Sequence, residues 1–443
     1  MTADAPLAAP GTAIPLHWHP DFSRIAAELH SRPAPHILPP VTISHIALLV
    51  TRREADTVRE RIAELCTRYG APPPFQEHHH AASLGRFDLR FERHTEFVSL
   101  SFFRPAGDIR PFADTALELV PTDWLASLPG VVVASLHLVF ARGELPPPAV
   151  IDELFEGQRV RASRVMGDAA VVWTDWRPHG DGFDRFYVVD RALDPSRAGR
   201  LVQRILELDT YRMLALLGLP LARRLAPRLT DLESTLSSIA ERIGEAREIE
   251  AKRRLLQELF ELAATAERTA TETAFRFGAT RAYHQLVRDR LQELREQRYE
   301  PFQPLGQFLT RRFEPAMRTC ASVAERLRSA NERIARAADL VRTRVDVELQ
   351  EQNQKLLASM ERRAALQLRL QETVEGLSVV VLSYYTLGLL GYLVKGLKPF
   401  GLAEKSQLLL LAGATPLVVL GMWLAMRRFR RHLRRQMGDD AHS

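Results

Sequence analysis

The feature that most constrains this chain is a run of nineteen residues without charge, GLSVVVLSYYTLGLLGYLV, at 376–394. About 20 residues of helix cross a hydrocarbon core roughly 30 Å thick. A second run, SQLLLLAGATPLVVLGMWLAM at 406–426, also contains no charge. A core helix of a soluble protein seldom lacks charge over such a length, and two in succession are rarer still. The sequence therefore predicts a two-helix transmembrane hairpin over 376–426.

The charges that flank this hairpin predict its orientation. Arginines precede the first run and six more follow the second, whereas the connection at 395–405 has only lysines as basic residues. Because arginine-rich flanks stay on the cytoplasmic side, we expect a two-pass protein of the bacterial inner membrane with both termini in the cytoplasm. The tail, 427–443, would anchor at the membrane surface. Its predicted anchors are Arg427, Arg428, Arg430, Arg431, Arg434 and Arg435.

The formal net charge of +6 is concentrated in this tail, which favours membrane lipid over nucleic acid as a partner. Nucleic-acid binding would need a basic surface spread over a folded module. The two cysteines, Cys66 and Cys320, lie far apart and outside any CxxC spacing, so we expect neither a disulfide framework nor a thiolate metal site. Residues 1–20 are rich in Pro and Ala, lack a signal-peptide pattern and are expected to be disordered.

The segment 21–195 mixes short strands with helices. Seven stretches alternate with period two or form short apolar runs typical of strands, and 54–69 has the pattern of an amphipathic helix. Hairpins predominate over regular strand–helix alternation, so the fold class is α+β, with a mixed or mainly antiparallel sheet and helices on it. The expected strands are 41–50, 86–92, 95–103, 131–141, 158–165, 169–176 and 183–190.

Residues 196–375 are expected to be long helices with coiled-coil character. Apolar residues from Leu229 to Ala246 recur every three or four positions, which is a heptad register. The last helix has no clear breaker before Gly376, so it is predicted to continue into the first span. The result would be a rod between a cytosolic sheet domain and the bilayer, with self-association through the heptads.

The densest group of ionisable residues in the sheet region is FERHTEF, which places Glu92, Arg93, His94 and Glu96 around a turn. Two carboxylates and an imidazole would suit a small ligand, a divalent cation or acid–base work. The alternative is a solvated turn in which Arg93 pairs locally with a glutamate. The metal identity and the cofactor are left open.

Four small or polar residues lie in the first predicted span: Ser383, Thr386, Gly388 and Gly391. Ser383 and Thr386 are three apart, so one face of a helix can present both. These residues would line a pore if several first spans surround an axis, or would allow close helix packing otherwise. Both interpretations stay open.

Common catalytic motifs are absent: the sequence has no GxxxxGK[ST] loop, no GxSxG elbow and no HExxH pair. EHHH at 77–80 follows prolines and is expected to be a solvated loop rather than a zinc site. The sequence therefore favours a protein that is not an enzyme. A weaker alternative is a membrane-tethered hydrolase that uses Glu92, His94 and Glu96.

Several phrases together resemble a bacterial family of membrane-anchored proteins known only as domain of unknown function 3422. They are ELHSRP at 28–33, HIALLV at 45–50, FERHTEF at 91–97, GRLVQRILELDTYRMLALLGLPLAR at 199–223 and LSYYTLGLLGYLVKG at 382–396. The resemblance covers nearly the whole chain. It implies the architecture described above and brings no activity, substrate or catalytic residue.

The order of sheet domain, long helices, two spans and basic tail is also similar to CorA-type magnesium channels. That family carries a Gly-Met-Asn signature at the outer end of its first span, whereas the corresponding stretch here is GYLVKGL. Gly391 has a match, but the Met and Asn do not. Lys395 and Lys398 at the mouth would repel a divalent cation.

The leading functional hypothesis is a homo-oligomeric inner-membrane protein. Its cytosolic sheet domain would sense a ligand or act as a scaffold, and its helical rod would couple that domain to the membrane. The alternative is a CorA-like ion channel or transporter whose first spans line a pore.

Overall fold

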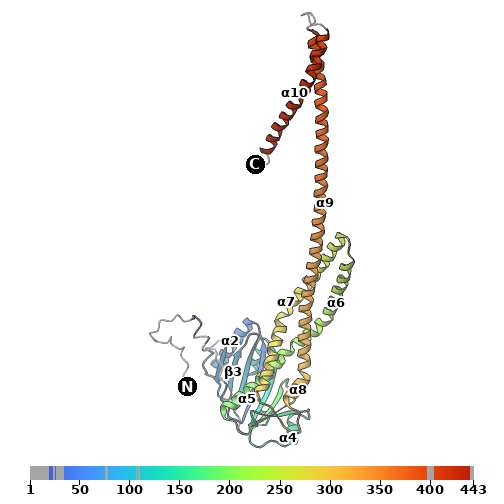
Figure 1. Cartoon of the computed structure of the whole chain (residues 1–443). Helices are drawn as coiled ribbons and strands as arrows, with labels where there is room; N and C mark the ends of the chain where they lie inside the picture. The colour runs from blue at the N-terminus through green and yellow to red at the C-terminus, as the bar shows by residue number, and fades with distance from the viewer. Residues whose placement is uncertain are drawn as a thin grey trace. The chain divides into compact units, whose positions relative to one another are not determined.

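We describe the protein from a computed structural model (Figure 1). The structure describes residues 19–22, 25, 34–74, 78–105, 107, 110–396 and 404–439. The predicted disordered segment, 1–20, lies outside these residues apart from His19 and Pro20. The chain divides into two compact units, the first made of Met1–Ala246 and Arg254–Asp339, the second of Arg247–Arg253 and Leu340–Ser443. The domain boundaries expected from the sequence stay predictions.

The first unit contains a mixed sheet of nine strands in the order β2-β3-β4-β1-β5-β8-β7-β6-β9. Every neighbouring pair is antiparallel except β5 and β8. The strands are β1 (Val41–Leu49), β2 (His79–Ser83), β3 (Asp88–Arg93), β4 (Phe97–Pro105), β5 (Val131–Arg142), β6 (Arg161–Val165), β7 (Ala170–Thr174), β8 (Asp184–Asp190) and β9 (Gln297–Arg298).

The α+β fold class and all seven predicted strands are confirmed, and the two strands that the sequence did not reveal lie at the edges of the sheet. β2 includes His79 and His80 of the EHHH phrase, so the loop expected there is wrong for these two residues. β9 pairs with β6 through only two residues, Gln297 and Arg298, too few for an alternating pattern to be visible.

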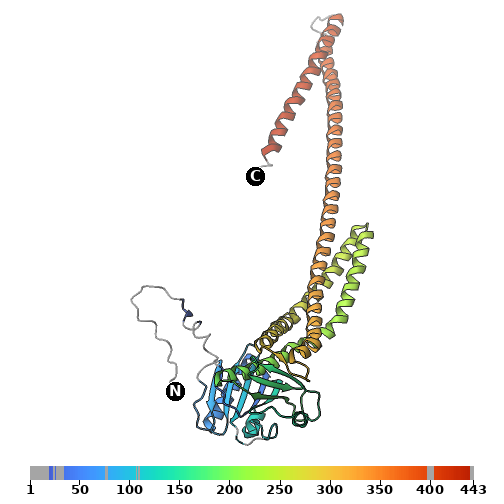
Figure 2. The same ribbon diagram turned by 60° about the horizontal axis from the view of Figure 1, so that its bottom comes forward.

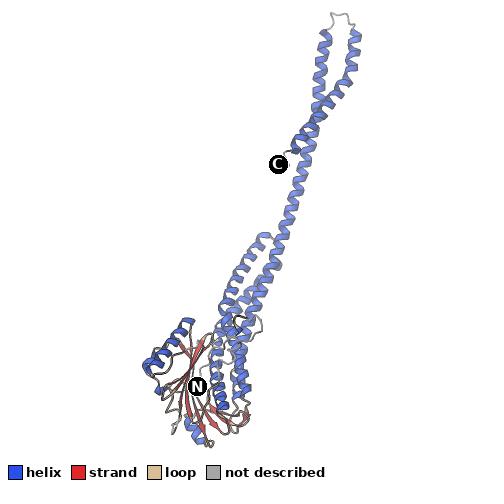
Figure 3. Ribbon diagram, turned by 90° about the vertical axis from the view of Figure 1, so that its left-hand side faces the viewer, coloured by secondary structure: helices blue, strands red, loops and turns tan. Residues whose placement is uncertain are grey.

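Helices connect and cover the strands, and Figure 3 shows them on both faces of the sheet. In chain order they are α2 (Arg52–Arg68), the 3-10 helix η1 (Leu117–Leu119), α3 (Thr122–Ala126), α4 (Pro148–Leu154), α5 (Pro195–Leu216), α6 (Gly218–Glu245), α7 (Ile249–Glu293), α8 (Leu305–Arg312), α9 (Glu314–Gly396) and α10 (Glu404–Asp439). Alternating side chains on each strand divide the core into two layers.

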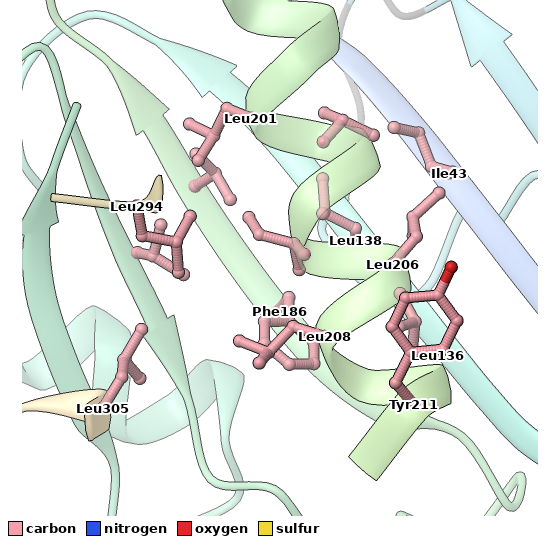
Figure 4. Packing of buried hydrophobic residues seen from close by; sticks show 14 of the residues in the cluster. Ile43, Leu136, Leu138, Phe186, Leu201, Leu206, Leu208, Tyr211, Leu294 and Leu305 are labelled. Atoms are coloured by element: carbon pink, nitrogen blue, oxygen red, sulfur yellow. The ribbon is translucent and has the colours of Figure 1, made fainter. Parts of the chain in front are cut away.

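One layer lies between the sheet and α5, and Figure 2 shows α5 running across the strands. It contains Ile43, Leu136 and Leu138 from the strands and Leu201 and Leu206 from α5, as Figure 4 shows at close range. The opposite layer packs strands β1 to β4 against α2 and α3, and α4 covers the rest of that face. The sheet is therefore buried on both sides.

The start of α5 is fixed by local sequence. Asp194 is the N-cap and accepts a hydrogen bond from the Arg197 backbone N–H at 2.8 Å, while Pro195 occupies the first turn. Gly199 then passes so close to the chain before β1 that a Cβ atom at this position would lie 1.5 Å from the Pro35 carbonyl oxygen. Only glycine permits this approach.

The long helices predicted after residue 196 are confirmed. On α6, Leu229, Leu236, Ile239 and Ile243 of the heptad pattern are buried. α9 continues without interruption from Glu314 to Gly396, as the lack of a breaker predicted.

The two-span hairpin is not shown. Among the described residues, one helical segment is long and apolar enough to cross a membrane, within Leu305–Gly396, and it contains the first predicted span. The second predicted span, 406–426, lies in α10, and no second such segment is found in the described part of the chain. The two-pass topology therefore stays a prediction.

Candidate functional site

A small polar cavity lies between α5 and strands β1, β3 and β4, in the otherwise apolar layer of the sheet. Its volume is about 40 Å³, which suits a water molecule or a small ion rather than a cofactor. The polar side chains around it include His45, Arg90, Glu92, His94 and Thr210. Two of the four residues predicted at FERHTEF, Glu92 and His94, thus lie in one cavity.

His45 is the innermost of these groups. It lies on β1 opposite Ser101 of β4, and its ring nitrogens contact two hydroxyls, Nδ1 with Ser101 Oγ at 2.8 Å and Nε2 with Thr210 Oγ1 at 3.0 Å. Burial lowers the pKa of His45 to about 4, although the charge of Glu92 opposes this shift. The imidazole is therefore neutral at physiological pH and can donate one hydrogen bond and accept the other.

Glu92 supplies the negative charge of the cavity. Arg90 Nε donates to Glu92 Oε1 at 2.9 Å, and His94 Nε2 lies 3.7 Å from Glu92 Oε2. Burial alone would raise the pKa of Glu92, but His94 and Arg90 together outweigh it and lower the pKa to about 2. The His94 ring stacks on Phe97 with 4.0 Å between centroids, which fixes its orientation. Glu92 is therefore ionised and can pair with a cation or accept a hydrogen bond.

The other two predicted residues, Arg93 and Glu96, point elsewhere. Arg93 follows Glu92 on the strand and so lies on the opposite face, where its Nη1 donates to Asp56 Oδ1 of α2 at 2.7 Å. Glu96 accepts hydrogen bonds from Arg276 of α7, one of them at 3.2 Å. Burial and the Glu96 carboxylate raise the pKa of the neighbouring Tyr283 phenol. The four residues therefore do not converge on one point.

This placement limits what the cavity can do. The described residues contain no group of three or more His, Cys, Asp or Glu side chains that could hold a metal ion. A neutral imidazole, an ionised carboxylate and two hydroxyls instead form a set of donors and acceptors that can orient a small polar molecule. The sequence missed His45 and Thr210, because each contacts residues of another element that lie far away along the chain.

A second polar cluster, Asp184, Asp209 and Arg212, was not predicted. Arg212 Nη2 donates to Asp184 Oδ2 at 2.7 Å and to Asp209 Oδ1 at 2.6 Å. Burial and the nearby Asp209 carboxylate raise the pKa of Asp184 to about 7, although Arg212 opposes the shift. The three side chains line a cavity of about 300 Å³. In the sequence, only the spacing of three between Asp209 and Arg212 on a helix indicates part of this cluster. Asp184 lies on β8 and comes close to them only in the folded protein.

The residues predicted for the pore or for helix packing lie in α9. Ser383 is 4% exposed, Thr386 donates its hydroxyl hydrogen to the Leu382 carbonyl at 2.7 Å, and Gly388 is exposed. A Cβ atom on Gly391 would lie 3.7 Å from Leu411 Cδ2 of α10, which is ordinary contact. Whether these residues line a pore or pack helices together stays a prediction.

Two of the six predicted membrane-surface arginines have described side chains. Arg427 and Arg428 are exposed, and the Arg427 guanidinium lies 5.0 Å from the centre of the Trp423 ring. Four predicted anchors lie where the structure describes the backbone but not the side chains: Arg430, Arg431, Arg434 and Arg435.

A family model described as "Protein of unknown function (DUF3422)" matches residues 17–433, nearly the whole chain. Among curated proteins, no sequence matches this one.

Proposed function

The chain belongs to the DUF3422 family, and from that premise we propose that it is a two-pass membrane protein whose sheet unit senses a small polar ligand. The observation that carries the membrane part is the exposure of large apolar side chains along α9 and α10. Leu389 is 65% exposed and Leu417 is 70% exposed, and their neighbours are similar. Exposed apolar patches larger than a few hundred Å² mark contact with a membrane or a partner.

The free energy of burying these side chains favours lipid as their surroundings. Full burial of one such leucine is worth about 1.5–3 kcal/mol. More than a dozen large apolar side chains are exposed between Leu377 and Leu424, so leaving them in water would forgo a free energy larger than the stability of most domains, about 5–15 kcal/mol. Hydrocarbon removes that penalty, since both helices satisfy their backbone hydrogen bonds internally.

Contacts at the ends of the apolar stretches support two spans. Gly391 lies near Leu411, which allows α9 and α10 to approach closely there. Trp423 and Arg427 lie at the end of the second stretch, where an aromatic ring and a cation are typical of the membrane–water interface. Ser383, one of the residues predicted to line a pore, is buried within the single chain, which argues against a pore-lining role for this residue.

The sensing part rests on the polar cavity. His45, Glu92 and Thr210 are held by strands and a helix of the sheet unit rather than by loops, so their geometry is fixed before a ligand arrives. Helix α9, which begins in that unit and contains the first apolar stretch, would connect ligand binding to the membrane. We also expect self-association through the exposed apolar side chains of α9, such as Leu356 and Met360.

The membrane proposal is tested by fractionation of cells that express the full chain. We expect the protein in the membrane fraction after washing with alkaline carbonate. The double substitution Leu389→Arg with Leu417→Arg should release most of it, since an arginine at the centre of a span costs about 2.5–3.5 kcal/mol.

The matched control is Leu356→Arg, which replaces an exposed leucine of the same helix outside the apolar stretch. It should leave the protein in the membrane. Two-pass topology is tested with Lys395→Cys and Ser359→Cys, because both native cysteines are buried. An impermeant maleimide should label Cys at 395 from outside the cell and Cys at 359 only after permeabilisation; the reverse pattern, or a wild-type protein in the soluble fraction, would refute the proposal.

A further inference from the structure

A second and larger cavity lies on the other side of the FERHTEF turn, beside the first two turns of α2. Its volume is about 570 Å³, within the range of small-molecule sites. Arg52 and Arg59 of α2 and Arg93 at the end of β3 line it, together with Asp56. His94 lines both this cavity and the smaller one.

Positive charge is in excess in this cavity. Three guanidiniums face a single carboxylate, Asp56, among the described charged groups that line it. Asp56 forms an ion pair with Arg93, while no ion pair is formed by Arg52 or Arg59 in the part of the chain that the structure describes. The pKa of Asp56 is lowered by the hydrogen bond from Arg93 and by the charges of Arg59 and Arg52.

The arrangement is partly built before any ligand binds. The Arg93 side chain is only 13% exposed, and it donates to Asp56 Oδ1 at 2.7 Å and to the Arg52 carbonyl oxygen at 3.4 Å. The N-terminus of α2 itself does not provide the site, because a capping box between Thr51 and Glu54 already satisfies it. The hydrogen-bond donors available to a ligand are therefore those of the arginine side chains.

We propose that this cavity binds a phosphate monoester, either on a soluble molecule or on a lipid headgroup. Three arginines and one aspartate leave a local charge of about +2, which matches the charge of about −1.5 to −2 on such a group. Guanidinium forks bind phosphate oxygens in pairs, with geometry that lysine cannot reproduce. The 570 Å³ volume leaves room for the organic part of the ligand.

Binding in this cavity would also affect the small cavity through the FERHTEF turn. Arg93 and His94 belong to the same turn as Glu92 and Glu96, and Glu96 is held by Arg276 of α7. A ligand that displaces Asp56 from Arg93 would act on this turn and so on the small cavity. This cavity is a second ligand site of the sheet unit, distinct from the small cavity, and it rests on the proposed sensor only for its role, because binding is measurable independently of membrane insertion.

The test is calorimetric titration of full-length protein in detergent with glycerol 3-phosphate, with inorganic phosphate and acetate for comparison. We expect glycerol 3-phosphate to bind in preference to acetate, and its dissociation constant to rise at least about ten-fold in the double variant Arg52→Gln with Arg59→Gln. The matched control is Arg53→Gln with Arg86→Gln, two exposed arginines that do not line the cavity and that should leave affinity unchanged.

The two ligand sources are separated with full-length protein in nanodiscs that contain or lack phosphatidic acid. Competition by phosphatidic acid with the soluble probe, or binding of that lipid alone, would assign the site to a headgroup, whereas binding of the soluble probe without competition would assign it to a free metabolite. If neither source binds at millimolar concentration, or if the two double variants weaken binding equally, the inference is wrong. Circular dichroism of each variant checks that the fold is retained.

Discussion

The same apolar residue types have opposite surroundings in two regions of this protein. In the sheet unit, Phe91, Phe102 and Trp173 are almost completely buried, and Ile43 is 0% exposed. Between 377 and 424, leucine, valine and tyrosine side chains are mostly exposed. Water favours the burial of apolar side chains and hydrocarbon does not, so the proposed membrane insertion of residues 377–424 would account for this difference.

Hydrogen bonds of two polar side chains illustrate the contrast. In the sheet unit, the guanidinium of Arg212 donates to the carboxylates of Asp184 and Asp209. Along the apolar stretch of α9, the hydroxyl of Thr386 returns to the backbone of its own helix. A helix surrounded by lipid has to satisfy its polar groups internally. The comparison predicts that equivalent substitutions in the two regions have unequal effects.

The largest effect is expected for loss of a buried ring. Phe91→Ala should lower the free energy of unfolding of the sheet unit by about 3–5 kcal/mol, because it removes apolar contacts and leaves a cavity. Leu389→Ala should change it by less than about 0.5 kcal/mol, since Leu389 is exposed. Urea titration followed by circular dichroism, on detergent-solubilised protein, measures both. Equal losses would remove the contrast between the two regions.

The next effect concerns two glycines in helices. Gly199→Ala should destabilise the sheet unit by about 1–3 kcal/mol, because the added methyl group overlaps the Pro35 carbonyl and forces the chain before β1 to move. Gly391→Ala should be tolerated, since the new methyl group would only touch Leu411. Thermal unfolding of the two variants gives the comparison. A stable Gly199→Ala variant would show that α5 lies farther from that segment than described.

The smallest effect is a pH dependence that only the buried region can produce. The pKa of Asp184 is raised to about 7 in the folded state, above its ordinary value of 3.8. Between these values the native state binds a proton that the unfolded state releases, so this group makes stability fall as pH rises. Asp184→Asn removes the effect. Relative to wild type, the variant should gain about 1 kcal/mol between pH 6 and pH 7.

Chemical denaturation at several pH values measures this difference. The exposed acidic residue Asp152 on α4 offers a matched control substitution, Asp152→Asn. If the difference in stability between Asp184→Asn and wild type is constant with pH, the pKa of Asp184 is the same in the folded and unfolded states.

The seven strands found from the sequence are those with a clear pattern of their own. β4, for example, contains Val98, Leu100 and Phe102 facing one layer and Phe97 and Phe103 facing the other. The two missed strands depend on neighbours: β2 is polar and pairs only with β3, and β9 has two residues that join β6 after a long helix. Edge strands need little apolar pattern, so sequence gives little signal for them.

The candidate site was found in part for a similar reason. Glu92 and His94 attract notice because they are close in sequence, and they do share a cavity. Their partners, His45 and Thr210, are 165 positions apart and meet only because α5 lies across β1. Arg93 was grouped with them, but the alternation of a strand sends it to the opposite face, toward α2.

By itself, the sequence determined the strand and helix periodicities, the unbroken helix α9 and the two uncharged apolar stretches, because these depend on neighbours within one turn or one strand. Only the tertiary structure decided which polar groups meet. His45 meets Thr210, Arg212 meets two aspartates, and three arginines line one cavity together with Asp56. Such contacts join residues far apart along the chain, and the free energy that selects them comes from burying the surfaces between them.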